Sequence, residues 1–186
     1  MRKIYILLTA ILLLQSSVCF ASDNYDSNIS LNSFLKRLVL ANARIENSFR
    51  RETIYDYQKF PDENKIVISQ DTSIILMLYC DKTFTKLQNI SVLFFTHDTD
   101  EKRGNFYFYG KKQKSEELLY RNVCKQVIFA LNTGLSRKEA RRILRAIGTY
   151  DKYLDCTQRS YTHADYKYIM KLSNDGVLIM NVSHII

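Results

Sequence analysis

Five cationic side chains in one short stretch are the residues best suited to chemistry in this chain. Arg137, Arg141 and Arg145 recur every four residues, so they line one face of a helix, with Lys138 and Arg142 beside them. Apolar residues take the other side: Leu135, Ala140, Ile143, Leu144 and Ile147. Such a face can bind an acidic protein surface, phosphate or lipid head groups, although a merely solvated helix face has the same pattern. It therefore predicts a binding site, with an acidic protein as the first candidate partner.

The cysteines predict structure rather than catalysis. One of the four, Cys19, lies in the N-terminal segment, which leaves Cys80, Cys124 and Cys156. In an oxidising compartment three cysteines favour one disulfide and one free thiol, and the sequence leaves open which two would pair. Their spacings of 44 and 32 residues match no CxxC redox or zinc motif.

Histidines and acids give weaker hints of catalysis. The histidines lie in three separate segments: His97, His163 and His184. Because they have no metal-ligand spacing, we expect neither a metal nor another cofactor. Three acids cluster in one connection: Asp98, Asp100 and Glu101. They could hold Ca²⁺ or act on a sugar bond, but Lys102 and Arg103 follow at once and favour a solvated loop. A cysteine paired with His97 or His163 is the remaining catalytic hypothesis.

Residues 1–21 have the layout of a secretory signal peptide. Arg2 and Lys3 precede an apolar run from Ile4 to Leu14, and small side chains stand near Ala21. The run is shorter than the roughly 20 residues of a membrane-spanning helix. We therefore expect cleavage after Ala21, with no transmembrane anchor left and residues 22–186 forming a periplasmic or secreted domain. A retained membrane helix and a lipid anchor on Cys19 are the alternatives.

Cleavage also bears on the choice of partner. It lowers the formal net charge from +8 to +6, because Arg2 and Lys3 are lost. The remaining surplus suits an acidic partner and leaves contact with a membrane surface open. Export disfavours nucleic acid as a partner.

Hydrophobic periodicity predicts an α+β fold. Three stretches have helical spacing: 31–49, 115–131 and 137–147. Six have β character: 65–68, 74–80, 89–96, 105–109, 164–172 and 177–183. This order predicts a single domain in which a mainly antiparallel sheet of about six strands packs with three helices. Both alternating sets of side chains in 74–80 are apolar, which predicts a central strand covered on both faces.

These features together favour an exported, non-catalytic binding protein. An inhibitor or immunity-type protein that binds its partner through the basic helix face is one concrete form. A small secreted hydrolase or effector is the first alternative, and a structural component of the envelope or of a secretion assembly is the second.

Overall fold

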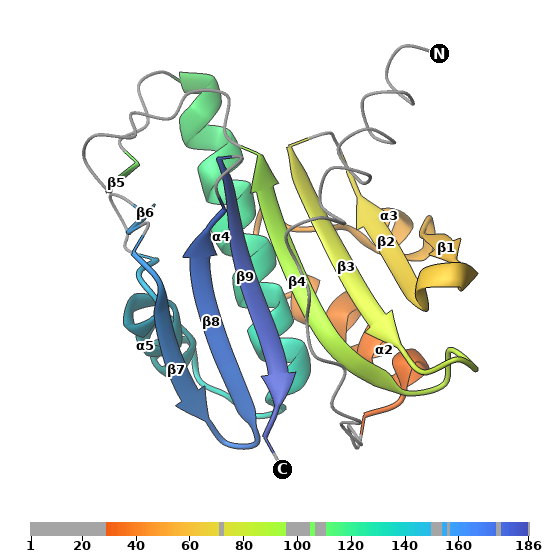
Figure 1. The fold of residues 1–186 in the computed structure, drawn as a ribbon. Coiled ribbons are helices and arrows are strands. Elements are labelled where there is room, and N and C mark those ends of the chain that lie inside the picture. Colours follow the sequence, from red (N-terminus) through yellow and green to blue (C-terminus); the bar gives the residue numbers. More distant parts are fainter. Residues whose placement is uncertain are drawn as a thin grey trace.

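The centre of the structure is a seven-stranded antiparallel sheet with the strand order β1-β2-β3-β4-β9-β8-β7 (Figure 1). Its strands are β1 (Gln58–Phe60), β2 (Lys65–Ser69), β3 (Ile74–Cys80), β4 (Leu87–Phe95), β7 (Arg159–His163), β8 (Tyr166–Leu172) and β9 (Val177–His184). A separate pair consists of β5 (Asn105–Phe106) and β6 (Leu154–Asp155). This computed structural model describes residues 29–70, 73–95, 105–106, 111–149, 154–155, 157–173 and 176–185.

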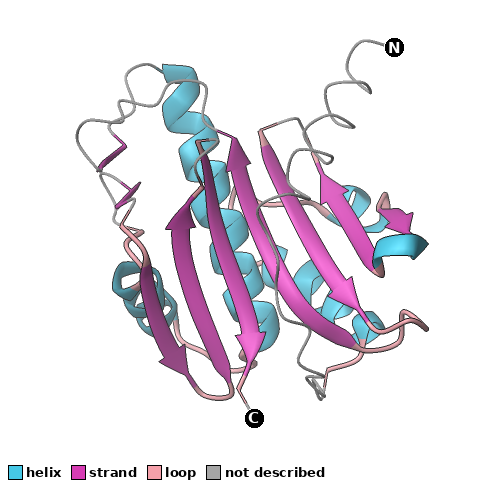
Figure 2. Ribbon diagram, in the orientation of Figure 1, coloured by secondary structure: helices cyan, strands magenta, loops and turns pink. Residues whose placement is uncertain are grey.

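The helices pack on one face of the sheet, as Figure 2 shows. They are α2 (Leu31–Asn42), α3 (Arg51–Tyr55), α4 (Lys111–Leu131) and α5 (Arg137–Ala146), with a short 3-10 turn η2 (Pro61–Glu63) at the sheet edge. The long helix α4 packs against α2 and contacts β3 and β4, while α5 contacts α4 and β7. None of the helices in the described ranges is long and apolar enough to cross a membrane.

The α+β prediction is confirmed, with one more strand in the sheet than expected. The run 164–172 was expected to be one strand, but a hairpin forms around Ala164 and Asp165 and adds β7 before β8. Ala164 adopts the left-handed conformation, with φ of 49°, in which the chain reverses. The expected strand 105–109 instead contributes β5, which pairs with β6 outside the main sheet. The edge strand β1 was also not predicted, so β1 and β7 join the sheet while 105–109 does not. Only the β5–β6 pair joins segments far apart in the sequence, because β7 and β8 form a local hairpin.

The first helix is shorter than its periodicity predicts. It begins at a Ser30 cap, whose Oγ accepts from Ser33 N at 3.2 Å, and it ends at Asn42 rather than near residue 49. Asn42 Nδ2 donates to Phe49 O at 2.7 Å, so the apolar residues beyond the helix end pack into the core as a loop. The prediction for α5 is confirmed to within one residue at its end.

The main core lies between the sheet and the helices. The helix-facing side chains of β3 are completely or almost completely buried there, among them Ile74, Leu76 and Leu78. The other face of β3 carries Ile75 and Met77, which are also buried and belong to a second, smaller cluster. The prediction that this strand is covered on both faces is therefore confirmed.

The order of elements repeats once along the chain. Helices α2 and α3 precede the meander β2-β3-β4, and helices α4 and α5 precede the meander β7-β8-β9. The last strands of the two meanders pair antiparallel in the middle of the sheet, from Asn89↔Ser183 to Phe95↔Val177. The helical contacts repeat as well, since α3 contacts α2 and β2 as α5 contacts α4 and β7. This is the arrangement that two similar halves related by a twofold rotation would have.

Candidate functional site

The five cations predicted to form a binding face lie on the outer side of α5. All are exposed: Arg137, Lys138, Arg141, Arg142 and Arg145. We call this set the basic face. The opposite side of α5 is buried in the core through Ala140, Ile143 and Leu144. Within the described chain the side chains of Lys138, Arg141 and Arg142 form no hydrogen bond or ion pair, so their charges are available to another molecule.

Local contacts hold α5 in a fixed position. Its first turn is a capping box, in which Ser136 Oγ accepts from Glu139 N at 3.2 Å and Glu139 Oε2 accepts from Ser136 N at 3.0 Å. Hydrogen bonds from the Ser136 side chain and backbone also lower the pKa of the Glu139 carboxyl. The connection before α5 is tied to the end of α2, because Arg44 donates to Leu135 O at 3.0 Å. The Arg44 guanidinium lies 4.3 Å from the centre of the Phe129 ring.

The predicted disulfide is not present in the described chain. Cys80 and Cys124 are both free thiols, and both are buried in the main core. Their wide sequence spacing carried no information about whether the two sulfur atoms meet, and each packs as a small apolar side chain. Burial raises the pKa of both thiols to about 12, so neither is a thiolate nucleophile at neutral pH. Cys156 lies outside the described residues.

The sheet brings two of the three histidines into one row. His163 of β7 pairs with Tyr166 of β8, and Tyr166 pairs with His184 of β9. Directly opposed residues point to the same face of a sheet, and two positions along β8 from Tyr166 the buried Tyr168 faces the helices. The row His163–Tyr166–His184 therefore continues the core-facing side of the sheet to the end of the strands.

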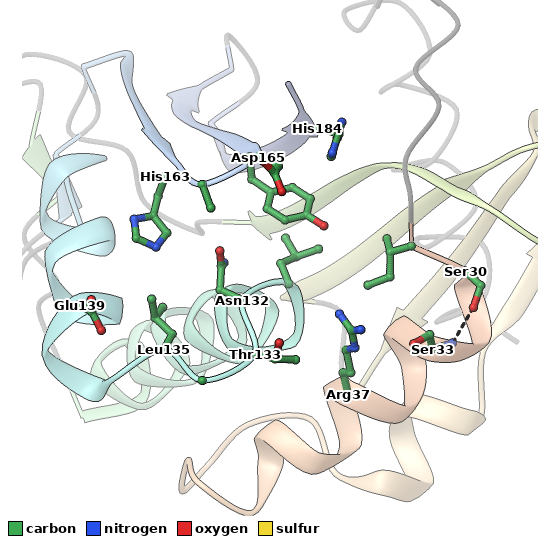
Figure 3. A pocket seen from close by; sticks show the side chains of 15 residues that line it. Ser30, Ser33, Arg37, Asn132, Thr133, Leu135, Glu139, His163, Asp165 and His184 are labelled. Carbon is green, nitrogen blue, oxygen red and sulfur yellow. Dashed lines mark hydrogen bonds between the residues drawn. The ribbon is translucent and has the colours of Figure 1, made fainter. Parts of the chain in front are cut away.

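A cavity of about 680 Å³ opens where this row passes beyond the core. Its walls come from the start of α2, the connection between α4 and α5, the β7–β8 turn and the end of β9. Figure 3 shows Arg37 pointing into this space from α2 and His163 pointing into it from the strand side. The polar lining residues are Ser30, Ser33, Arg37, Asn132, Thr133, Glu139, His163, Asp165, Tyr166 and His184. We call this space the sheet-end cavity, and its size lies within the range of small-ligand sites.

The charges around the sheet-end cavity act on one another. Burial raises the pKa of the Tyr166 hydroxyl, the Arg37 guanidinium acts in the opposite direction, and the Asp165 carboxylate adds to the rise. Asn132 fixes the floor, since its Nδ2 donates to Tyr168 Oη at 2.7 Å. Burial raises the pKa of the Tyr168 hydroxyl well above its usual range, so it is neutral under all ordinary conditions.

Tyr166 stands between the two histidines of the row. The His184 ring meets the Tyr166 ring edge-on, with 5.6 Å between centroids, and its Nδ1 is buried without a hydrogen-bond partner. Neither His163 nor His184 hydrogen-bonds to a Ser, Thr or Cys side chain within the described ranges. No group of His, Cys, Asp or Glu in those ranges could hold a metal ion. His97 and the acids Asp98, Asp100 and Glu101 lie outside the described residues.

Sequence reasoning found the basic face and missed the sheet-end cavity. The four-residue period of the arginines is a local signal, whereas the cavity joins segments up to 155 positions apart, from Ile29 to His184. The β7–β8 hairpin offered one local signal for part of the cavity lining. A turn at Ala164–Asp165 places His163 opposite Tyr166, so recognising β7 would have put one histidine and one tyrosine side by side.

No family model, curated protein or solved structure matched the chain in three comparisons.

Proposed function

We propose that this protein is an exported, non-catalytic binding protein that binds an acidic protein partner through the basic face. The observation that supports this best is the exposure of all five cations on a helix whose opposite side is buried in the core. An inhibitor or immunity-type protein, which neutralises the protein that it binds, is one concrete form. Export to the periplasm or cell exterior rests on the signal-like sequence of residues 1–21.

The rigidity of α5 supports a role in binding. The capping box fixes the first turn, and Ala140, Ile143 and Leu144 fix the remainder against the core. A partner would therefore meet side chains whose backbone is already in place, so little backbone entropy is lost on association. Arg137 is further restrained, because one guanidinium nitrogen donates to Arg44 O at 3.3 Å.

The charge pattern supports an acidic partner. A single exposed ion pair contributes only about 0–1 kcal/mol, so one arginine would not hold a partner. Five cations on one face act together, and they accelerate encounter with a negatively charged surface. Arginine also offers two parallel donors to each carboxylate, which fixes orientation as well as contact.

Charge reversal on α5 tests this proposal. The triple variant Arg137→Glu, Arg141→Glu, Arg145→Glu removes three attractive contacts and introduces three repulsive ones. At roughly 1 kcal/mol for each position, the affinity for the partner should fall about 100-fold. The measurement is capture from the secreted and periplasmic fractions by immobilised protein, with the wild-type partner identified by mass spectrometry and its affinity then determined by titration.

A control with the same total charge separates position from net charge. Lys36→Glu, Lys82→Glu and Lys167→Glu change three exposed lysines that lie on α2, in the turn after β3 and on β8. The affinity of this variant for the partner should stay within a few-fold of the wild-type value. Equal loss in both variants, or full retention in the α5 variant, would overturn the proposal. Binding of wild-type protein to anionic phosphatidylglycerol vesicles instead of a protein would also overturn it, in favour of a membrane surface.

A further inference from the structure

We propose that the sheet-end cavity is a second binding site, which takes one carboxylate group and uses Arg37 as its anchor. The site is distinct from the basic face, and the inference goes beyond the proposed function. The ligand chemistry is that of a small organic acid or of the C-terminal carboxylate of a peptide.

Arg37 is the first reason for this assignment. The side chain is only partly exposed, points into the sheet-end cavity, and has no hydrogen bond or ion pair within the described chain. A partly buried guanidinium without a counter-ion has lost some of its hydration and gained nothing in return. A carboxylate in the cavity would compensate for the lost hydration through two parallel hydrogen bonds.

Other residues that line the sheet-end cavity provide additional donors. The Tyr166 hydroxyl lies within the electrostatic influence of Arg37 and forms no hydrogen bond to a described residue. Thr133 adds an exposed hydroxyl from the α4–α5 connection. His163 lines the same space. A ligand in the cavity would therefore meet polar groups held by different elements, as in a small-molecule site.

The acids of the cavity limit the charge of the ligand. Glu139 and Asp165 both line it, so a phosphate with about two negative charges would be repelled by two carboxylates. The Glu139 carboxylate is held against the wall, because it accepts hydrogen bonds from Ser136 N and Oγ at 3.0 and 2.6 Å. A ligand with one negative charge can approach Arg37 without displacing it. These charges favour a carboxylate over a phosphate.

The shape of the site supports an end group followed by a larger body. The cavity of about 680 Å³ is much larger than a single carboxylate. Its apolar lining residues give the rest of a ligand something to contact: Ile29, Leu131, Leu135 and Ala164.

The test follows backbone amide signals of the full chain by ¹⁵N NMR during titration. The probes are acetate, a hexapeptide with a free C-terminus, the same peptide amidated, and inorganic phosphate. Saturable shifts are expected at Thr133, Gly134 and Tyr166 with acetate and with the free peptide, and none with the amide. Tighter binding of the peptide than of acetate assigns the carboxylate to a peptide end, and equal binding assigns it to a small acid.

Two variants one position apart make the result specific. Arg37→Gln should weaken binding roughly 10- to 100-fold, the effect expected for losing hydrogen bonds to a charged group. Lys36→Gln removes the same charge from an exposed residue outside the cavity, and its affinity should stay within twofold of wild type. Equal weakening in both variants would overturn the assignment, as would the absence of saturable shifts or tighter binding of phosphate than of acetate. The ¹⁵N spectrum of each variant shows directly whether its fold is preserved.

Discussion

Replacing Gln126 with methionine tests how α4 is held against the rest of the helical layer. Gln126 is completely buried on α4. Its Nε2 donates to Leu38 O and to Phe49 O, both at 2.9 Å, and its Oε1 accepts from Phe49 N at 3.2 Å. These three hydrogen bonds join α4 to α2 and to the loop that follows α2. Methionine has a similar volume but can form none of them, so the substitution removes polar contacts without opening a large cavity.

The largest single contribution to the expected loss of stability comes from one backbone donor. Phe49 O keeps a second partner, because Asn42 Nδ2 donates to it at 2.7 Å. Phe49 N has no other partner in the described chain and would be left buried and unsatisfied, at a cost of about 1–3 kcal/mol. The two bonds from Nε2 add about 1 kcal/mol each, and the greater apolarity of methionine returns about 1 kcal/mol. The free energy of unfolding should therefore fall by about 3 kcal/mol.

Urea unfolding followed by far-UV circular dichroism measures this loss. With a slope of about 2 kcal/mol/M, the midpoint should fall by about 1.5 M while the slope itself is unchanged. Gln58→Met on the exposed edge strand β1 is the matched control, and it should change stability by less than about 0.5 kcal/mol. A loss below 1 kcal/mol for Gln126→Met, at unchanged slope, would refute the reasoning that these hydrogen bonds hold α4 in place.

Two further predictions concern the thiols and the turn after β3. Cys80 and Cys124 should react with Ellman's reagent only after unfolding in urea, because both are buried and have a raised pKa; a disulfide-linked peptide in a non-reducing mass map would contradict this. The Asp81 carboxylate accepts from Thr85 N at 2.7 Å and from Lys86 N at 2.9 Å, and hydrogen bonds of this kind, with that from the Thr83 hydroxyl first, hold its pKa below the usual range. Its contribution to stability is thus present above the unfolded-state pKa near 4 and is lost as the pH falls below it. Asp81→Asn should flatten the dependence of the urea midpoint on pH between about 4 and 2, whereas curves that run parallel for wild type and variant would count against this role for Asp81.

Local signals explain why some elements could be predicted from the sequence. The α5 helix carries its own start signal in Ser136 and Glu139 and its own period in the arginines, so it needs no distant partner to be recognised. In β3 the apolar side chains on both faces predict that the strand is buried. The basic face follows from the same helical period, because a side chain on the polar side of an amphipathic helix must face solvent.

Weak local signals and long-range contacts explain what could not be predicted from the sequence. The β7 strand, with its Arg-Ser-Tyr-Thr-His sequence, has weak apolar alternation, and its turn at Ala164–Asp165 lacks the glycine that usually marks a hairpin. Unless β7 is recognised, the pairing of His163 with Tyr166 cannot be predicted. The row that lines the sheet-end cavity then cannot be predicted either. Two cysteines 44 residues apart were likewise no guide to whether their sulfur atoms meet.

The repeated order of elements explains where the sheet-end cavity lies. Arg37 comes from α2, the first helix of the N-terminal half, whereas His163, Tyr166 and His184 come from the meander of the C-terminal half. The two halves meet through the pairing of β4 with β9 and the packing of α2 on α4. The α2–α4 contact brings a cation from one half over the strand ends of the other. Each half alone therefore lacks part of the site, and the hydrogen bond from Gln126 to Leu38 O joins α4 to α2 one residue from Arg37.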